Sequence, residues 1–251
     1  PPRLAFSRRV SRALRRWAIA AALLVLLAVL LVEGSGYVGR HPQDFPWTRL
    51  DLDQRAGRFT GTKLAALADD PRRCRALLAR AGSRDRAAPP LIAPPPCGYA
   101  DGMMLVPQTA DAPAYRPAGL ITACPVAAAL AMWERDVVRP AARRYFGQPI
   151  VAIDHAGSYS CRHIAGQSAF SEHSTADAID IMNFRLRDGR TVSVRHGWHG
   201  GSAEAAFLHA VRDGACGLFS TVLSPDYNRA HADHLHLDQA ARGAWGWRGC
   251  R

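Results

Sequence analysis

The six cysteines of this 251-residue chain include no Cys-x-x-Cys pair. This absence excludes a cysteine zinc knuckle and a thioredoxin-like redox site, because both need closely paired cysteines. Scattered cysteines of even number in an exported chain are typical of a disulfide framework, so we predict three disulfides among the fifteen possible pairings. The alternative is that one or two pairs stay reduced as small buried hydrophobic residues. The cysteines are Cys74, Cys97, Cys124, Cys161, Cys216 and Cys250.

Lysine is almost absent, because only Lys63 is a lysine among the 32 Lys and Arg residues. Arginine therefore carries nearly all of the formal net charge of +11. Six arginines precede the first apolar run with no acidic residue among them, so the rest of the chain is only mildly basic, near +5 (+11 minus 6). This balance argues against nucleic acid as a partner and is compatible with an anionic polymer such as cell wall. The six are Arg3, Arg8, Arg9, Arg12, Arg15 and Arg16.

The sixteen residues from Trp17 to Val32 are all apolar and follow that arginine cluster. A spanning helix needs about 20 residues, and the segment after Glu33 can supply the remainder. We predict a transmembrane signal anchor over residues 17–36, with residues 1–16 as a basic cytoplasmic tail because positive flanks stay inside. The alternative is a cleaved signal peptide, although no small-x-small cleavage site follows the run. The sequence thus predicts a single-pass inner-membrane protein with a periplasmic body.

The segment after the anchor, residues 37–96, is predicted to be a helical preface with a proline-rich connector. Thr60 is the expected N-cap of the preface helices, and Pro71 should split them into two short helices. Residues 87–96 contain the run of prolines that forms the connector. The next predicted helix covers residues 124–138 and should end at Pro140.

From Ile150 onward the pattern changes to strands, over residues 150–160, 178–186, 191–194 and 234–238. The Asp188-Gly189 pair predicts a hairpin turn. Between the strands lies an amphipathic helix over residues 202–212, with Ser202 as its cap and Gly214 as its stop. Helices first and strands later indicate an α+β domain over residues 97–251, with a small antiparallel sheet and flanking helices.

Histidine and aspartate residues of the last third have the spacing of a catalytic zinc site. His173 and Asp180 are seven residues apart, and His236 follows in the final strand. Zn²⁺ in hydrolases is usually held by three nitrogen or oxygen ligands, with water in the fourth position. His234 is two residues before His236, so both side chains should point the same way from one strand. Asp238 either supports a ligand or serves as a cap or salt-bridge partner.

The remaining histidines have no such spacing. We interpret them as surface or structural residues; they are His41, His155, His163, His196, His199, His209 and His231.

Four motifs, CPVAAALAMW, SYSCR, SEHSTADAIDI and HADHLHLD, resemble those of the bacterial extensin-like C-terminal domain family. The order SxHxxGxAxD and then DHxH also resembles the LAS group of zinc peptidases, which includes D-alanyl-D-alanine carboxypeptidases and murein endopeptidases. The resemblance covers residues 47–251 and implies a LAS- or hedgehog-like fold. One departure is Ala176, where the peptidases have glycine. A methyl group is tolerated there if the backbone is not left-handed.

The resemblance also implies roles for individual residues, which the chemistry supports. His173, Asp180 and His236 would hold zinc. Asp233 would be the general base, or alternatively a partner that orients His234. His234 would stabilise the oxyanion. Arg162 would bind the substrate, or alternatively be an ordinary strand-edge charge. Ser171 would be a substrate-site residue that fixes the motif loop.

These expectations combine into one functional hypothesis: a membrane-anchored periplasmic zinc metallopeptidase that cleaves amide bonds in peptidoglycan peptides. The main alternative is a noncatalytic wall-binding or assembly module that keeps zinc for structure. A second alternative is a buried polar network without metal. A base and an oxyanion group favour the enzyme, because a structural zinc site needs neither.

Overall fold

The computed structural model describes residues 2–109, 112–242 and 248–251, with side chains from residue 14 onward in the first helix. The helices are α1 (Pro2–Arg40), η1 (Pro42–Asp44), α2 (Thr60–Ala65), η2 (Ala66–Asp69), α3 (Pro71–Arg80), α4 (Cys124–Trp133), the π-helical turn η3 (Glu134–Val138), α5 (Arg139–Phe146), η4 (Glu172–Thr175), α6 (Val194–Gly197), α7 (Ala203–Ala215) and η5 (Arg229–His231). The strands are β1 (Arg86–Ala87), β2 (Leu91–Ile92), β3 (Gly98–Tyr99), β4 (Met103–Met104), β5 (Ala114–Arg116), β6 (Ile121–Thr122), β7 (Ile150–Gly157), β8 (Ala178–Leu186), β9 (Thr191–Ser193), β10 (Thr221–Leu223), β11 (Leu235–Asp238) and β12 (Gly249–Cys250).

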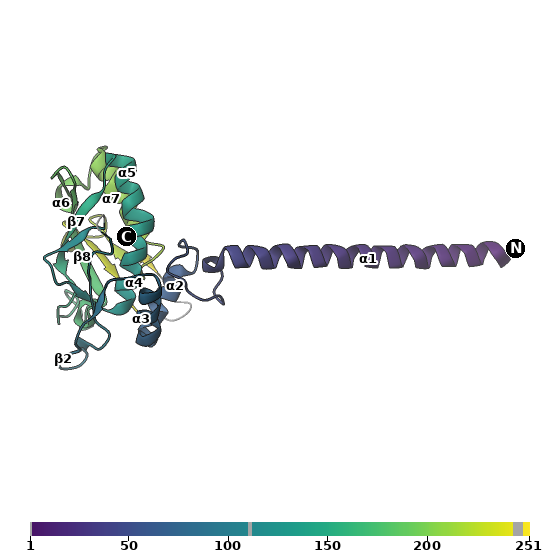
Figure 1. The fold of residues 1–251 in the computed structure, drawn as a ribbon, viewed down its shortest axis with the longest axis horizontal. Helices are drawn as coiled ribbons and strands as arrows, with labels where there is room; N and C mark the ends of the chain where they lie inside the picture. Colours follow the sequence, from purple (N-terminus) through teal and green to yellow (C-terminus); the bar gives the residue numbers. More distant parts are fainter. Residues whose placement is uncertain (1, 110–111, 243–247) are drawn as a thin grey trace.

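Helix α1 projects away from the rest of the molecule (Figure 1). Its stretch from Leu14 to Arg40 is long and apolar enough to cross a membrane, and none of it is buried inside the structure. The helical conformation and the length of the apolar stretch therefore agree with the segment predicted from the sequence. This segment could be a membrane anchor or a signal sequence.

The preface forms two short helices on either side of Pro71, as predicted. The predicted cap at Thr60 is wrong by one residue, because Phe59 occupies the N-cap position and α2 begins at Thr60. The hydroxyl of Thr60 instead accepts a hydrogen bond from the backbone of Gly57 at 2.8 Å. It therefore stabilises the turn before the helix.

Pro140 does not end its helix, contrary to the prediction. The helical chain runs from α4 through the π-helical turn η3 into α5. In η3 the backbone N–H of Arg139 bonds to the carbonyl of Glu134, five residues back. Such a widened turn gives space to a proline ring that would clash in a regular α-helix.

Gly214 is not a helix stop either, since α7 continues to Ala215. A Cβ atom at position 214 would overlap the side chain of Val137 in η3. Glycine at this position therefore allows α7 to approach the π-helical turn closely. The predicted cap of the same helix is confirmed, because the Ser202 hydroxyl accepts from Ala205 N at 3.1 Å.

The main sheet has seven strands in the order β12-β10-β11-β8-β7-β5, with β9 paired to β8. Its central pairs are antiparallel, as predicted, and the Asp188-Gly189 turn joins β8 to β9. Its outer pairs differ from the prediction, because β5 with β7 and β10 with β12 are parallel. Helices and small sheets are thus mixed along the chain.

A β-bulge in β8 decides which face of the sheet each side chain uses. Asp154 pairs with Asn183, but the next residue, His155, pairs with Ile181, so β8 has one extra residue between these pairs. A bulge of this kind reverses the alternation of side chains. Phe184 consequently packs against the helices, at 6.0 Å from Trp133 and 5.1 Å from Phe207 between ring centroids, while Asp180 points to the opposite face.

The chain is cross-linked by three disulfides, as predicted. Cys74–Cys124 joins α3 to the start of α4, and Cys216–Cys250 joins the end of α7 to β12. Cys97–Cys161 ties the end of the proline-rich connector to the loop after β7. The preface and the connector are thereby fastened to the sheet domain.

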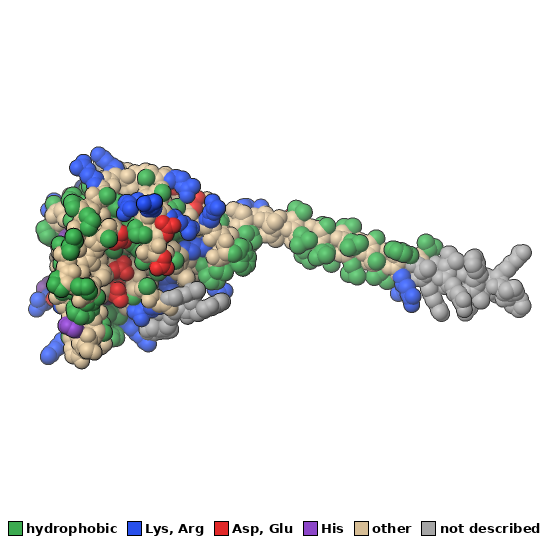
Figure 2. All heavy atoms as spheres, turned by 90° about the horizontal axis from the view of Figure 1, so that it is seen from below, with side chains coloured by type: hydrophobic (Ala, Val, Ile, Leu, Met, Phe, Trp, Pro, Cys, Tyr) green, Lys and Arg blue, Asp and Glu red, His purple; other side chains and the backbone are tan. Residues whose placement is uncertain are grey.

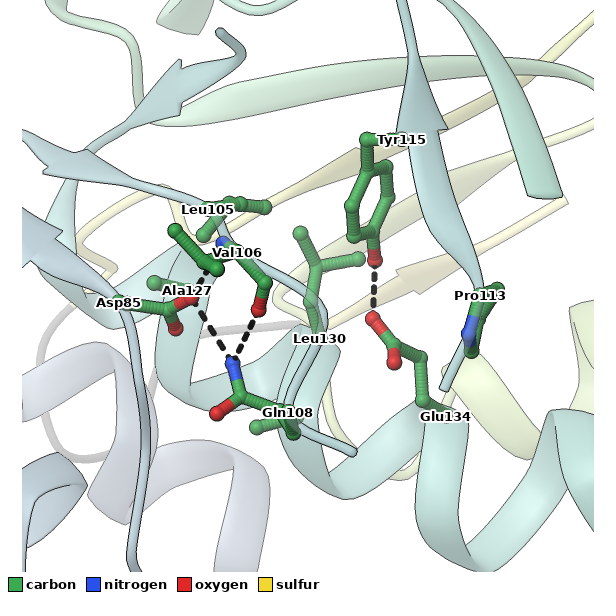
Figure 3. Close-up of a pocket in the computed structure, with 10 residues that line it drawn as sticks. Asp85, Leu105, Val106, Gln108, Pro113, Tyr115, Ala127, Leu130 and Glu134 are labelled. Atoms are coloured by element: carbon green, nitrogen blue, oxygen red, sulfur yellow. Dashed lines mark hydrogen bonds between the residues drawn. The ribbon is translucent and has the colours of Figure 1, made fainter. Parts of the chain in front are cut away.

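A buried carboxyl group lies at the junction of α4 and η3 (Figure 3). Glu134 is 7% exposed, and its Oε1 accepts a hydrogen bond from the hydroxyl of Tyr115 at 2.5 Å. Burial raises the pKa of Glu134 to about 7, although the bond from Tyr115 acts in the opposite direction. Asp85 lines the same cavity and adds to the increase.

The substitution Glu134→Gln is expected to abolish the decrease in the free energy of unfolding that wild type shows as the pH rises to neutrality. The folded-state pKa of Glu134 is raised, so its contribution to stability is fully present below the unfolded pKa and is lost as the pH rises through about 7. Integrated over that window, the loss is up to about 3 kcal/mol. Glutamine stays neutral and still accepts from Tyr115. Urea unfolding at pH 5 and pH 8 checks this: wild type should weaken between the two values more than the variant, and equal slopes would contradict the assignment.

Candidate metal centre

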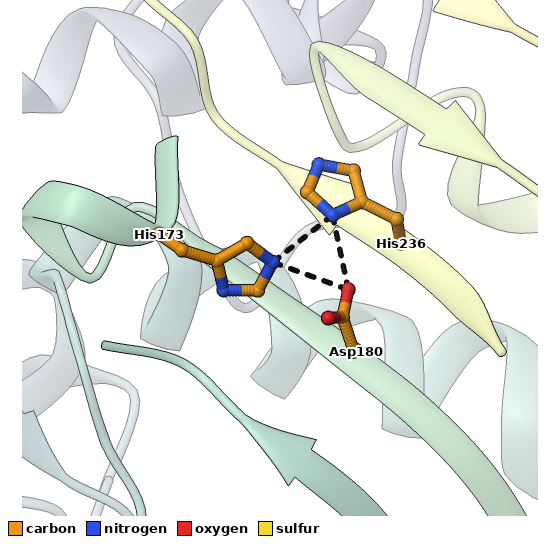
Figure 4. Close-up of side chains that lie close together, drawn as sticks. All are labelled: His173, Asp180 and His236. Atoms are coloured by element: carbon orange, nitrogen blue, oxygen red, sulfur yellow. Dashed lines mark hydrogen bonds and ion pairs between the residues drawn. The ribbon is translucent and has the colours of Figure 1, made fainter. Parts of the chain in front are cut away.

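Three side chains from separate parts of the chain meet on one face of the sheet (Figure 4). Asp180 on β8 and His236 on β11 are direct partners in the antiparallel ladder, so their side chains project from the same face. His173 comes from η4, the short turn before β8. Their ligand atoms are close together: His173 Nε2 is 3.2 Å from Asp180 Oδ1 and 3.2 Å from His236 Nδ1, and the last two are 3.0 Å apart.

Neighbouring groups fix the orientation of both rings. His173 Nδ1 lies 2.6 Å from the carbonyl of Ser158, which can only accept, so Nδ1 carries the hydrogen. His236 Nε2 lies 3.1 Å from Asp238 Oδ2, which fixes the other ring in the same way. Asp238 therefore supports His236, and its second oxygen accepts from Ala240 N at 3.0 Å. Metal-binding histidines usually have such a partner.

This arrangement fits a metal ion. With the outer nitrogens donating, His173 Nε2, His236 Nδ1 and Asp180 Oδ1 present lone pairs to one point. Such converging lone pairs need a positive charge between them, either a shared proton, as in the hydrogen bonds of Asp180 with the two rings, or a metal cation. Ligands of a tetrahedral zinc, at about 2.0–2.2 Å from the ion, are roughly 3.3 Å from each other. The observed separations of 3.0–3.2 Å are close to that value, and all three residues are buried.

The charges of the cluster are strongly coupled. Burial raises the pKa of Asp180, but hydrogen bonds with His173 and His236 outweigh it and hold the pKa well below its usual range. Burial lowers the pKa of His236, but its bonds with Asp180 and Asp238 outweigh that effect and raise it to about 9. The carboxylates therefore make this point of the protein attractive to positive charge.

His234 and Asp233 lie beside the cluster on its more exposed side. Strand β11 begins at Leu235, so His234 precedes the strand rather than belonging to it as predicted. Its ring still faces the cluster, with Nε2 at 3.6 Å from Asp180 Oδ1. His234 Nδ1 is bonded to Asp233 Oδ1 at 2.8 Å, and the Asp233 side chain is 41% exposed. Asp233 and His234 thus form a hydrogen-bonded pair at the rim.

Ser171 and Arg162 stabilise the loop that presents His173. Ser171 is the N-cap of η4, and its hydroxyl accepts from His173 N at 3.4 Å. The carbonyl of Arg162 accepts from Ser171 N at 3.0 Å and from the hydroxyl of Ser174 at 3.1 Å. Strand β7 ends at Gly157, so Arg162 belongs to the loop and not to a strand. Arg162 is exposed, and its charge lowers the pKa of His231.

His231 also belongs to this group, although the sequence predicted it to be a surface or structural histidine. Its ring centroid is 5.1 Å from that of His234 and 6.0 Å from that of His236. Burial lowers its pKa to about 4, and the positive charges nearby add to the effect. A signal was present in the spacing, because His231 and His234 are three residues apart in a turn, in which His234 N donates to the carbonyl of His231 at 3.5 Å.

The backbone at Ala176 does not have the conformation in which alanine was expected to be tolerated. The residue is left-handed, with φ 57° and ψ 20°, and it is fully buried. Its carbonyl accepts from Ala123 N at 2.8 Å and from the Ser158 hydroxyl at 3.0 Å. The turn that joins His173 to β8 is therefore held in a conformation that favours glycine.

Ala176→Gly is expected to change the free energy of unfolding by less than about 0.5 kcal/mol. Relief of the left-handed backbone gains about 1–2 kcal/mol, which offsets about 0.8 for the lost methyl group and about 0.5–1 for glycine entropy. The matched control is Ala178→Gly, which is equally buried but lies in a strand, and should cost about 1.5 kcal/mol. Denaturant unfolding of both variants measures the difference; equal losses would show that position 176 is unstrained.

Comparison with known proteins adds one finding. Residues 72–251 match the family model described as extensin-like protein C-terminus. No curated protein and no solved structure matches the chain. The match begins inside α3 and contains every residue of the metal cluster and its rim.

Proposed function

The chain belongs to the extensin-like protein C-terminus family, and from this premise and the geometry of the cluster we propose that it is a membrane-anchored periplasmic zinc metallopeptidase that cleaves amide bonds in peptidoglycan stem peptides or crosslinks. The observation that carries the proposal is the combination of two groups. His173, Asp180 and His236 form a three-ligand set, and the Asp233–His234 pair stands beside it. A catalytic zinc site has three protein ligands and acid–base groups next to an open position.

Each of these residues would have a distinct task. Zinc, when held by His173, Asp180 and His236, supplies a Lewis acid that acidifies water near neutral pH. Asp233 accepts the proton of the attacking water and returns it to the leaving amine. His234, held through Nδ1 on Asp233, would direct Nε2 toward the oxyanion that develops on the amide carbonyl and stabilise it.

Substrate recognition would fall to Arg162. Its backbone is bonded to the motif loop, while its side chain is exposed and carries charge toward the rim. A guanidinium can bind a carboxylate with two parallel hydrogen bonds, and stem peptides present such carboxylates. Ser171 would act through the loop, since its hydroxyl caps η4 and holds His173 in place.

The order of the motifs, which resembles that of the LAS zinc peptidases, supports the same reaction class. Helix α1 supports the proposed location. Its apolar stretch is preceded by arginines, which favours a cytoplasmic N-terminus and a periplasmic body close to the wall. In this position the site would be within reach of peptidoglycan peptides.

The proposal is tested by digestion of purified peptidoglycan and defined muropeptides with the full-length, zinc-loaded protein in detergent. Mass spectrometry should detect hydrolysis products, and their masses would identify the bond. The control is the same protein after removal of zinc by a chelator, which should give none. One tightly bound zinc per chain without turnover on any wall substrate would instead favour a noncatalytic wall-binding module.

A further inference from the structure

A groove with three arginines lies on the preface, away from the metal cluster. It has a volume of about 640 Å³ and is lined by Arg49, Leu50, Arg73, Ala76, Leu77 and Arg80. Arg73 and Arg80 are seven residues apart on α3 and therefore lie on one side of the helix, with Leu77 between them. Leu50 and Leu77 are buried, so they form an apolar floor beneath the exposed arginines.

The arginines of this groove have no partner for their charge among the described residues. In the part of the chain that the structure describes, the side chains of Arg49, Arg73 and Arg80 make no hydrogen bond or ion pair, and no carboxylate lines the groove. Three like charges around one opening repel one another. A phosphate group would relieve that repulsion, because guanidinium groups bind phosphate oxygens in pairs.

The position of the groove indicates where such a phosphate would come from. Helix α3 lies on the side of the body from which α1 leaves (Figure 1). Only eight residues separate the end of α1 at Arg40 from Arg49. Between them Trp47 is 73% exposed, and in the last turns of α1 Tyr37 is 49% exposed, as expected of aromatic residues at a membrane interface. Figure 2 shows the apolar side chains that α1 exposes over the part of the helix drawn in colour.

We propose that this groove binds the phosphate headgroup of an anionic phospholipid in the membrane that α1 enters. The inference rests on the proposed role of α1 as an anchor. The arginines would hold the headgroup, while the apolar floor would contact its glycerol and first methylene groups. Binding would draw the preface onto the bilayer surface and restrict the orientation of the body relative to the wall.

Lipid retention by the full-length protein tests this inference. The protein is prepared in micelles that contain zwitterionic lipid, phosphatidylglycerol is titrated in, and native mass spectrometry counts the bound lipid. Each basic residue near a membrane surface contributes roughly fivefold in affinity, so the triple variant Arg49→Gln, Arg73→Gln, Arg80→Gln should bind about a hundredfold more weakly. The control Arg116→Gln, Arg143→Gln, Arg144→Gln removes the same charge from exposed positions elsewhere and should stay within about twofold of wild type.

Other outcomes would overturn the inference. Equal loss in both triple variants would show a general effect of net charge. Displacement of the lipid by millimolar inorganic phosphate would show a site for free anions. Failure of the anchor is detected separately, by finding the chain in the soluble fraction of cells. Failure of the proposed peptidase is also separable, because hydrolysis of soluble muropeptides should be the same in wild type and in the groove variant.

Discussion

His173→Ala is expected to lower the affinity for zinc roughly a thousandfold, because it removes one of three protein ligands from a buried site. The variant would leave two of the three proposed ligand atoms, Asp180 Oδ1 and His236 Nδ1, which are 3.0 Å apart. Those two groups can share a proton, so the cluster would lose much of its preference for a metal. Zinc per chain after dialysis, measured by atomic emission, should fall from about one to near zero.

A graded series makes this result specific. Asp238→Asn leaves all three ligands but weakens the support of His236, and should cost about 10–100-fold in affinity. His199→Ala removes an exposed histidine outside the cluster and should leave binding unchanged. If all three variants retained zinc as wild type does, the metal would lie elsewhere. If the chain bound no zinc at all, the cluster would be a buried polar network.

The clustering of His173, Asp180 and His236 could be predicted from the sequence because part of its geometry is local. His173 and Asp180 are joined by a short loop, and the two-residue spacing of His234 and His236 predicts that both face one side, although His234 lies just before β11. The bulge in β8 could not be predicted, since it depends on how β7 pairs across the sheet. Without that bulge Asp180 would lie on the same face as Phe184, inside the helical core. The sequence pattern therefore identifies residues that cluster in the structure, but it does not explain why they meet.

Two further features could not be decided from the sequence for a related reason. The role of Asp238 beside His236 was left open, and the position of His231 near the cluster was missed. Asp238 had two equal roles in the sequence, and only the 3.1 Å contact with His236 Nε2 decides between them. His231 reaches the rim because η5 turns it back toward His234. The same distinction applies to the fold. Helices with local sequence signals were predicted. Pro140 was misinterpreted because a π-helical turn accommodates its ring, and Gly214 because it allows a close neighbour to pack against the helix.

The disulfide pairing is another property that local sequence does not contain. Each bond joins segments that are 34 to 64 residues apart. Cys97–Cys161 ties the connector to the loop that also contains Arg162, so it restricts the part of the chain that is proposed to bind substrate. The number of bonds follows from the cysteine count and the predicted export, whereas their partners follow from the folded sheet domain.

Asp233→Asn is expected to lower kcat/KM for the proposed hydrolysis by about 10²–10⁴-fold, with zinc content unchanged. Asparagine has nearly the shape of aspartate but cannot take up a proton at neutral pH. Zinc should stay bound because Asp233 is bonded to His234 and not to any of the three ligands. Stopped assays on the muropeptide that wild type cleaves best, with zinc measured on the same samples, provide both values.

A second substitution separates the general base from a residue that only orients its neighbour. The 2.8 Å bond between Asp233 Oδ1 and His234 Nδ1 makes either role geometrically reasonable. Asparagine can still accept that bond, whereas alanine cannot. If Asp233 is the base, the Asn and Ala variants should lose activity to nearly the same extent, since both lack the proton acceptor. If Asp233 only orients His234, the Asn variant should keep activity within about tenfold of wild type and only the Ala variant should lose more. That second pattern would transfer the role of proton acceptor to His234, whose Nε2 already faces the cluster at 3.6 Å from Asp180.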